Sequence, residues 1–278
     1  LYSLAMENGF TPCDLAPNRQ QTYIVAGKPW TPRNANHSRY GQMVPLKWGL
    51  AQSNNWISAY LMSKLNPSQF VQLLHDYGIN NPEIHASMSL CLGPCEVSVA
   101  EMVSAYTAFA NHGIRTSPLF VSRIEDNEGN TIATFQPRMN EVISADNAMK
   151  MLTMLMGVVD QGTAGRLRYR YNMEGQIGAK TGTTNNNSDG WFIGFTPQLV
   201  TGCWVGGEDR DIHFDSMSMG QGATMALPIW AIFMKKVYSD PSLGFSPMVK
   251  FDIPLDYDPC ESQSQDEFGA DGIEEVFE

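Results

Sequence analysis

The sequence predicts an α+β fold, in which an antiparallel sheet packs with helices and an all-helical region adjoins it. Helical patterns occupy the middle of the chain and a meander of strand patterns follows them, an order typical of this class. Hydrophobic residues make up 43% and charged residues 17% of the 278 residues, so the chain can bury a sizeable core. This composition excludes collagen-like, disordered and disulfide-dense chains.

Apolar periodicity and capping residues predict the helices. Residues 1–8 have the pattern of the second half of a helix that ends at Gly9, because they lack an N-cap and are too few to nucleate alone. A capping box of Ser98 and Glu101 opens a helix that runs to residue 113, and Ser144 opens the strongest helix. The remaining helices are predicted at about 45–52, 56–65, 66–77 and 224–238.

Strand patterns follow the strongest helix. The three predicted strands lie at about 173–183, 190–196 and 199–206. In the second of them, Trp191, Ile193 and Phe195 occupy alternate positions, which favours a strand. An earlier hairpin is predicted at 119–135, and residues 11–43 are predicted to be irregular because they are rich in Pro, Asn, Thr and Gly.

The negative charge of the protein is concentrated at its C-terminus. The formal net charge is -11, yet residues 1–250 hold 19 acidic and 18 basic residues, and residues 251–278 hold ten acidic residues and no Lys or Arg. We therefore predict a domain over 1–245 and an acidic tail over 246–278, with disorder or loose attachment after Pro259. A nearly neutral body has no broad basic face, which argues against nucleic acid as a partner.

Targeting signals and metal-ligand clusters are absent from the sequence. No apolar run is long enough to span a membrane, and no basic segment followed by an apolar one marks a signal peptide. The five cysteines are too few and too scattered for a disulfide scaffold; Cys91 and Cys95 are interpreted as loop thiols, with a disulfide between them as the alternative. The histidines form no i, i+4 pair, so we expect no metal and no cofactor.

Two polar motifs are candidates for an active site. Lys180-Thr181-Gly182-Thr183-Thr184 ends a predicted strand, where a lysine offers positive charge, hydroxyl groups can bond a carboxylate and a glycine admits a substrate backbone. Ser53-Asn54-Asn55 lies 127 residues earlier, between two predicted helices. Each motif alone is common in unrelated chains, so their order, spacing and context decide the interpretation.

The residues around both motifs resemble the transpeptidase domain of class A, bifunctional penicillin-binding proteins. The resemblance is carried by residues 178–197, by Ala51-Gln52-Ser53-Asn54-Asn55-Trp56, by the helix 101–113 and by residues 158–165, and it covers roughly residues 1–238. It implies the fold shared by penicillin-binding proteins and β-lactamases, and a D,D-transpeptidase that crosslinks peptidoglycan stem peptides. In that chemistry a serine forms an acyl-enzyme, which an amine resolves and which β-lactams trap.

The resemblance assigns roles to residues of both motifs. Ser53 would relay a proton toward the leaving amine, and Asn55 would hold the substrate amide and the essential lysine of the family. Lys180 would lend positive charge near Ser53 and the substrate carboxylate. Thr181 and Thr183 would bind the substrate carboxylate, and the Thr183 N–H would donate to the oxyanion. The residues alone also allow Asn55 to be a helix N-cap, Lys180 a solvated strand residue and Thr183 a β-branched residue that only fills space. The predicted catalytic residues are Ser53, Asn55 and Lys180, and the predicted substrate-binding residues are Lys180, Thr181, Gly182 and Thr183.

The nucleophile motif of the family, Ser-x-x-Lys, is absent because no lysine has a serine three residues before it. In the family this motif opens the helix whose second half would be residues 1–8. We therefore expect a longer parent with the motif, a glycosyltransferase domain and a membrane anchor, at the periplasmic face of a bacterial inner membrane. The fragment itself is predicted to be inactive. Its expected partners are stem peptides, β-lactams and other cell-wall synthesis proteins.

Two other functions stay open at this point. A non-catalytic relative that binds stem peptide or a protein partner would need no nucleophile, and the residues encoded before Leu1 would discriminate it from an enzyme. A class A β-lactamase would carry Glu-x-x-Leu-Asn between the two motifs, and no glutamate here starts such a segment. The transpeptidase interpretation predicts that Ser53, Asn55 and Lys180 converge on one groove beside the first helix.

Overall fold

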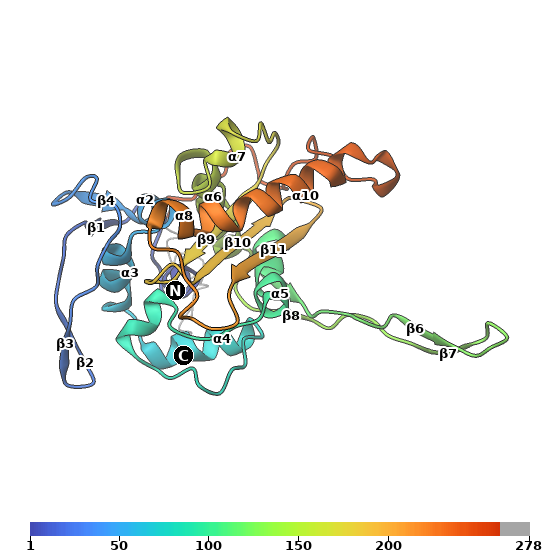
Figure 1. Cartoon of the computed structure of the whole chain (residues 1–278), viewed down its shortest axis with the longest axis horizontal. Coiled ribbons are helices and arrows are strands. Elements are labelled where there is room, and N and C mark those ends of the chain that lie inside the picture. The colour runs from blue at the N-terminus through green and yellow to red at the C-terminus, as the bar shows by residue number, and fades with distance from the viewer. Residues whose placement is uncertain (262–278) are drawn as a thin grey trace, which may run out of the picture.

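A three-stranded antiparallel sheet lies at the centre of the fold (Figure 1). The computed structural model describes residues 1–261. The strands follow the order β11-β10-β9 across the sheet, with bounds β9 (Gly178–Thr183), β10 (Asp189–Phe195) and β11 (Val200–Gly206). The three predicted strands are therefore confirmed, although β9 begins at Gly178 rather than near residue 173.

Helices cover both faces of this sheet. α10 (Leu227–Ser239) crosses its front in Figure 1, and the Trp230 ring of α10 occupies the space that a side chain at Gly194 would need. On the opposite face, Val103 of α5 (Val99–Ala110) lies where a side chain at Gly202 would point. α6 (Ala145–Gln161) contacts β9. Gly194 and Gly202 let α10 and α5 approach the strands closely. The combination of helices with an antiparallel sheet confirms the α+β prediction.

The predicted helices are present with small shifts in their ends. Ser98 and Glu101 form the predicted capping box, and Asn66 caps its helix with Pro67 at the first position. The helices of the all-helical region are α1 (Tyr2–Glu7), α2 (Leu46–Ala51), α3 (Asn55–Met62) and α4 (Pro67–Asp76). The short helices that the sequence did not predict are η1 (Met88–Leu92), α7 (Arg166–Tyr169), α8 (Met217–Gly220), α9 (Gly222–Met225) and η2 (Pro241–Leu243).

Within residues 1–261, four small two-stranded sheets lie outside the central sheet. They pair β1 (Leu15–Pro17) with β4 (Met43–Pro45), β2 (Tyr23–Val25) with β3 (Lys28–Trp30), β5 (Ile114–Thr116) with β8 (Met139–Glu141), and β6 (Arg123–Glu125) with β7 (Thr131–Thr134). The prediction that residues 11–43 are irregular is wrong for β1, β2, β3 and the start of β4. A strand of three residues is too short for an alternating pattern to be recognised in the sequence. The hairpin predicted at 119–135 is confirmed and forms the arm that projects from the body in Figure 1.

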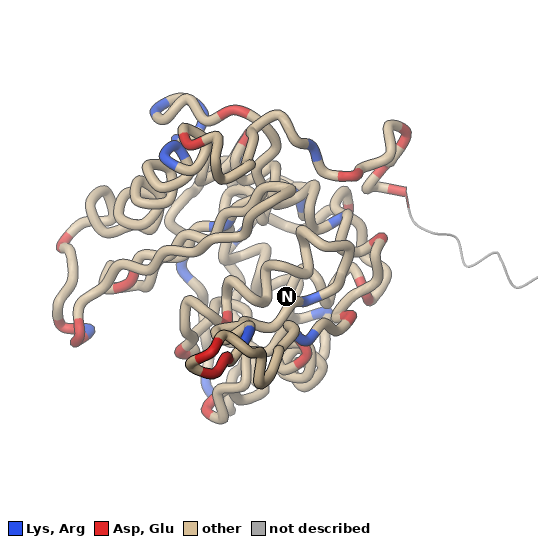
Figure 2. Tube along the Cα trace, turned by 90° about the vertical axis from the view of Figure 1, so that its right-hand side faces the viewer, with Lys and Arg blue, Asp and Glu red and all other residues tan. Residues whose placement is uncertain are grey.

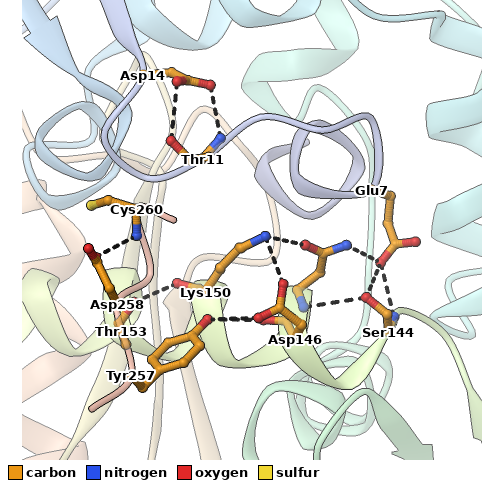
Figure 3. Close-up of polar contacts among 11 residues, drawn as sticks. Glu7, Thr11, Asp14, Ser144, Asp146, Lys150, Thr153, Tyr257, Asp258 and Cys260 are labelled. Carbon is orange, nitrogen blue, oxygen red and sulfur yellow. Dashed lines mark hydrogen bonds and ion pairs between the residues drawn. The ribbon is translucent and has the colours of Figure 1, made fainter. Parts of the chain in front are cut away.

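The N-terminal helix α1 is tied to the first turn of α6. The Glu7 carboxylate accepts hydrogen bonds from the Ser144 N–H at 3.0 Å, from the Ser144 hydroxyl at 3.1 Å and from the Asn147 side chain at 2.8 Å (Figure 3). Ser144 is also the N-cap of α6, as predicted. A carboxylate is stabilising at a helix N-terminus, so Glu7 fixes α1 against α6.

The chain after residue 245 packs along the body. Phe251 is buried and its ring lies 5.8 Å from that of Phe195, centroid to centroid. The Tyr257 hydroxyl donates to the Asp146 carboxylate at 3.3 Å, and the buried Lys150 ammonium pairs with the same carboxylate at 2.8 Å (Figure 3). The predicted boundary after residue 245 stays a prediction, and the acid-rich residues 262–278 lie outside the described residues.

A disulfide joins the two ends of the described fold. Cys13 and Cys260 are bonded, with Cα atoms 5.3 Å apart and a sequence separation of 247. The Lys47 ammonium lies 3.3 Å from the Cys13 sulfur. The sequence does not predict this bond, because cysteine spacing says nothing about contacts over such a separation. Cys91 and Cys95 are free thiols, as interpreted from the sequence.

Two general features of the described residues are the distribution of their charges and the character of their helices. Along the trace in Figure 2, acidic and basic residues are interspersed and neither sign dominates that view. Within residues 1–261, no helix combines the length and the apolar character that crossing a bilayer requires.

Candidate active site

Ser53 lies in a tight turn between α2 and α3. α2 ends at Ala51, and Asn54 caps α3 by accepting hydrogen bonds from the N–H groups of Trp56 and Ile57. Between the helices, Ser53 has a φ of 51°, in the left-handed region that non-glycine residues rarely adopt. The side chain is exposed. A strained backbone under an exposed polar side chain is typical of functional sites.

Lys180 reaches Ser53 from strand β9. Its Nζ donates to the Ser53 Oγ at 2.8 Å and to the main-chain oxygen of Thr181 at 2.8 Å. The first of these bonds connects the helical region to the central sheet. The structure therefore brings Ser53 and Lys180 together across 127 positions of sequence, while their catalytic roles stay predictions.

The surroundings of Lys180 weaken its hold on its proton. Burial lowers the pKa of Lys180 to about 8, because a poorly solvated site disfavours the charged ammonium. At neutral pH most molecules still carry this charge. Its bond to Ser53 uses a lone pair of Oγ and leaves the hydroxyl proton free to be donated to another group. The pair can therefore attract an anion and transfer a proton.

Asn55, the third predicted catalytic residue, is bonded to a different segment. Its side-chain Nδ2 donates to the main-chain oxygen of Arg33 at 2.8 Å, and its N–H donates to the Asn34 Oδ1 at 2.9 Å. The helix-cap alternative is wrong, because Asn54 is the residue that caps α3. No hydrogen bond within the described residues joins Asn55 to Lys180, and the role of Asn55 toward a substrate stays a prediction.

The predicted substrate-binding residues of β9 divide between the two faces of the strand, Lys180 with Gly182 and Thr181 with Thr183, because residues two apart point the same way. Thr181 is buried, and its hydroxyl lies 2.8 Å from that of Thr163. Thr183 is exposed, and its hydroxyl accepts a hydrogen bond from the Gly222 N–H at 2.9 Å. A Cβ at Gly182 would meet the Cβ of Trp191 at 3.0 Å. Both threonine hydroxyls thus have protein partners, and their predicted bonds to a carboxylate stay predictions.

Sequence reasoning gave no role to the turn that follows α6. The Gln52 side chain donates to the main-chain oxygen of Gln161 at 2.9 Å, and the Thr163 N–H donates to the main-chain oxygen of Ala51 at 3.0 Å. In the sequence, residues 158–165 are distinguished only by their resemblance to the family. The available signal was a polar residue, Thr163, directly after the glycine that ends the strongest predicted helix.

Comparison with known proteins identifies relatives of this chain. The family model for the penicillin binding protein transpeptidase domain matches residues 1–202. Penicillin-binding protein 1A of Aquifex aeolicus (strain VF5) is 32% identical over 239 residues, which cover 85% of this chain and 32% of that protein. Penicillin-binding protein 1A of Neisseria gonorrhoeae is 32% identical over 247 residues, which cover 84% of this chain and 30% of that protein.

Solved structures agree with these matches. Penicillin-binding protein 1A from Haemophilus influenzae superposes with a TM-score of 0.80 at 25% identity, covering 91% of this chain and 42% of that chain. PonA1 from Mycobacterium tuberculosis in complex with penicillin V shares the fold, with a TM-score of 0.71 at 23% identity over 90% of this chain and 68% of that chain. The chain spans less than a third of the length of the two curated relatives. Its sequence and fold place it in the penicillin-binding protein transpeptidase domain family.

Proposed function

We propose that this chain is the transpeptidase part of a peptidoglycan synthase that crosslinks stem peptides by serine acyl transfer and binds β-lactams. The observation that carries the proposal is the 2.8 Å hydrogen bond from Lys180 Nζ to Ser53 Oγ. It joins the two motifs on which the family resemblance depends. Membership of the family supports acyl transfer in peptidoglycan synthesis as the reaction class.

In the proposed reaction, Ser53 and Lys180 act on the leaving group. When the terminal D-alanine is expelled, its amine must gain a proton that the attacking serine loses. Ser53 can donate its hydroxyl proton to that amine and accept the proton that the attacking serine loses. The Ser53 hydroxyl is therefore restored after each transfer. The ammonium of Lys180, bonded to Ser53 Oγ, stabilises negative charge on this oxygen during the transfer.

The proposed site recognises a carboxylate through Lys180. Strand β9 lies at the edge of the sheet and carries the half-buried Lys180 and the exposed Thr183, and an extended peptide can lie alongside the backbone of such a strand. A D-alanyl-D-alanine terminus supplies the required anion, and a β-lactam carries a carboxylate as well. Charge-assisted bonds of this kind are about twice as strong as neutral ones.

The 278 residues alone are expected to form no covalent adduct with penicillin. They contain no Ser-x-x-Lys sequence, and binding without a nucleophile leaves only reversible contacts. Intact-mass spectrometry after incubation with a fluorescent penicillin checks this, with a full-length penicillin-binding protein 1A as the positive control. A stable adduct at one equivalent per chain would contradict the expectation and show that another residue supplies the nucleophile.

Reversible binding of an N-acylated D-alanyl-D-alanine peptide is expected to weaken as the pH rises through about 8. The ammonium of Lys180 is the proposed anion partner, and its pKa is lowered to about 8, so the charge is lost above that pH and kept below it. Fluorescence polarisation between pH 6 and pH 9.5 measures the dissociation constant. If the affinity is constant over this range, the peptide carboxylate does not bind at Lys180.

The disulfide supports the proposed location outside the cytoplasmic membrane. Bonds such as Cys13–Cys260 persist in oxidising compartments and are rare where thiols are kept reduced. Peptidoglycan stem peptides are crosslinked in the same kind of compartment. We accordingly place the proposed activity, together with its cell-wall partners, on the periplasmic face of the inner membrane.

A further inference from the structure

The turn from Gln161 to Thr163 touches both halves of the proposed site. On the side of the Ser53 turn, the Gln161 main-chain oxygen accepts a hydrogen bond from Gln52 at 2.9 Å and the Thr163 N–H donates to Ala51 at 3.0 Å. On the side of β9, the hydroxyls of Thr163 and Thr181 lie 2.8 Å apart. The same three-residue turn therefore contacts the residues next to Ser53 and next to Lys180.

The approach of this turn to the Ser53 turn is as close as backbones allow. A Cβ at Gly162 would lie 2.2 Å from the main-chain oxygen of Ala51, closer than any side-chain carbon can sit. Because the obstacle is backbone, a rotamer change cannot relieve it. Gly162 thus fixes the spacing between the end of α6 and the end of α2.

The turn is also held firmly from the side of the core. Val158 and Val159 in the last turns of α6 are fully buried, and so are Ala164 and Leu167 just beyond it. A turn flanked by buried side chains keeps its position independently of the site that it touches. The turn is thus a fixed point against which the neighbouring elements pack.

From these contacts we propose that Thr163 is a positioning residue, which holds the Ser53 turn and strand β9 at the separation at which Lys180 bonds Ser53. Its N–H fixes one element and its hydroxyl fixes the other. The proposal deepens the proposed function, since this separation matters to catalysis only if Ser53 and Lys180 act on a substrate. Thr163 itself touches neither side chain of that pair in the described hydrogen bonds.

The variants Thr163→Val and Thr163→Ser separate positioning from general structure. Valine keeps the shape of threonine and the N–H bond to Ala51 but removes the hydroxyl bond to Thr181, whereas serine keeps both bonds. Thr153→Val is the matched control, because the Thr153 hydroxyl also bonds within the protein, at 2.8 Å to the Lys150 main-chain oxygen. That bond lies on α6 and contacts neither half of the site.

The first readout is the titration of Lys180, followed by NMR of labelled lysine side chains in the full chain. With the hydroxyl bond removed, one restraint between β9 and the turn is lost, so the spacing between Lys180 and Ser53 can widen and water can reach the ammonium. We therefore expect the pKa of Lys180 to rise from about 8 toward its ordinary value in Thr163→Val. Thr163→Ser and Thr153→Val are expected to titrate like the wild type. A loss of stability alone would not move this pKa.

The second readout is the affinity for the D-alanyl-D-alanine peptide. We expect Thr163→Val to bind the peptide about three- to tenfold more weakly, which is the change that the loss of one neutral hydrogen bond produces. Thr163→Ser is expected to bind with wild-type affinity. If Thr163→Val leaves both the Lys180 titration and the affinity unchanged, Thr163 does not position the site.

The two readouts keep this inference distinct from the proposed function. If the wild type fails to bind the peptide, the proposed function is in error, but the NMR titration still decides whether Thr163 sets the surroundings of Lys180. If Thr163→Val does not fold, Thr181→Val removes the same hydroxyl bond from the other side and is titrated instead. An unshifted Lys180 in that variant overturns the proposal.

Discussion

Replacing both Cys13 and Cys260 with serine is expected to lower the free energy of unfolding by roughly 2–5 kcal/mol. The disulfide closes a loop between cysteines with a sequence separation of 247, and closing a long loop restricts the unfolded chain most strongly. This is the largest stability effect that we expect from any pair of side chains outside the core. Urea unfolding without reductant, followed by tryptophan fluorescence, measures it.

The matched control for this variant is Cys95→Ser. It also removes a sulfur from a half-buried position, but the thiol of Cys95 is free, so its unfolding midpoint should stay close to that of the wild type. Adding reductant to the wild type should reproduce the effect of the double variant. Equal midpoints for the wild type and the double variant would show that the bond does not form in solution.

The loss of the disulfide should act first on the C-terminal segment. Residues 246–260 contain no helix or strand and are held by side-chain contacts, among them the burial of Phe251 and the Tyr257 bond to Asp146. Hydrogen exchange should therefore increase in this segment well before the central sheet is affected, since local opening follows the number of buried contacts.

Replacing Lys180 with methionine is expected to weaken peptide binding about 10- to 100-fold, as the loss of a charge-assisted hydrogen bond implies. The same variant should be more stable than the wild type by about 1–2 kcal/mol, because burial of the ammonium is unfavourable and methionine removes that cost. Binding and stability thus change in opposite directions, as expected for a residue retained for function. Fluorescence polarisation and urea unfolding measure the two effects.

The stability of the wild type should also depend on pH through Lys180. The folded protein has the pKa at about 8, against 10.5 for the ordinary group. Between these values the unfolded state binds more protons, so the free energy of unfolding rises with pH across this window, and Lys180→Met should lack that contribution. Lys235→Met, at an exposed position of α10, is the control for both the stability and the binding measurements.

The binding measurement decides the role of Lys180. If Lys180→Met binds the peptide as tightly as Lys235→Met, Lys180 is not the anion partner.

The sequence predicted the parts of this fold whose signals are local. The capping box at Ser98 and the N-caps at Asn66 and Ser144 are satisfied within a few residues, so their helices could be placed without tertiary information. The alternation around Ile193 likewise placed β10. For the site, the family resemblance linked Ser53 to Lys180, which no local pattern could have joined.

The rest depends on contacts between distant segments. The pairing of β1 with β4, the bond between Cys13 and Cys260, and the turn at Thr163 all require the folded chain before their partners meet. Asn55 shows the same limit within the site. Its type and position fitted a catalytic role, but the segment it contacts, around Arg33, could not be inferred from spacing.

The Cys13–Cys260 bond makes most of the polypeptide a covalent ring. A single peptide-bond cleavage anywhere between these cysteines opens the ring and releases no fragment. The projecting β6–β7 arm carries the exposed Arg123, which trypsin can reach without unfolding the core. A molecule nicked there should migrate as one band on a non-reducing gel and as two bands once dithiothreitol is added.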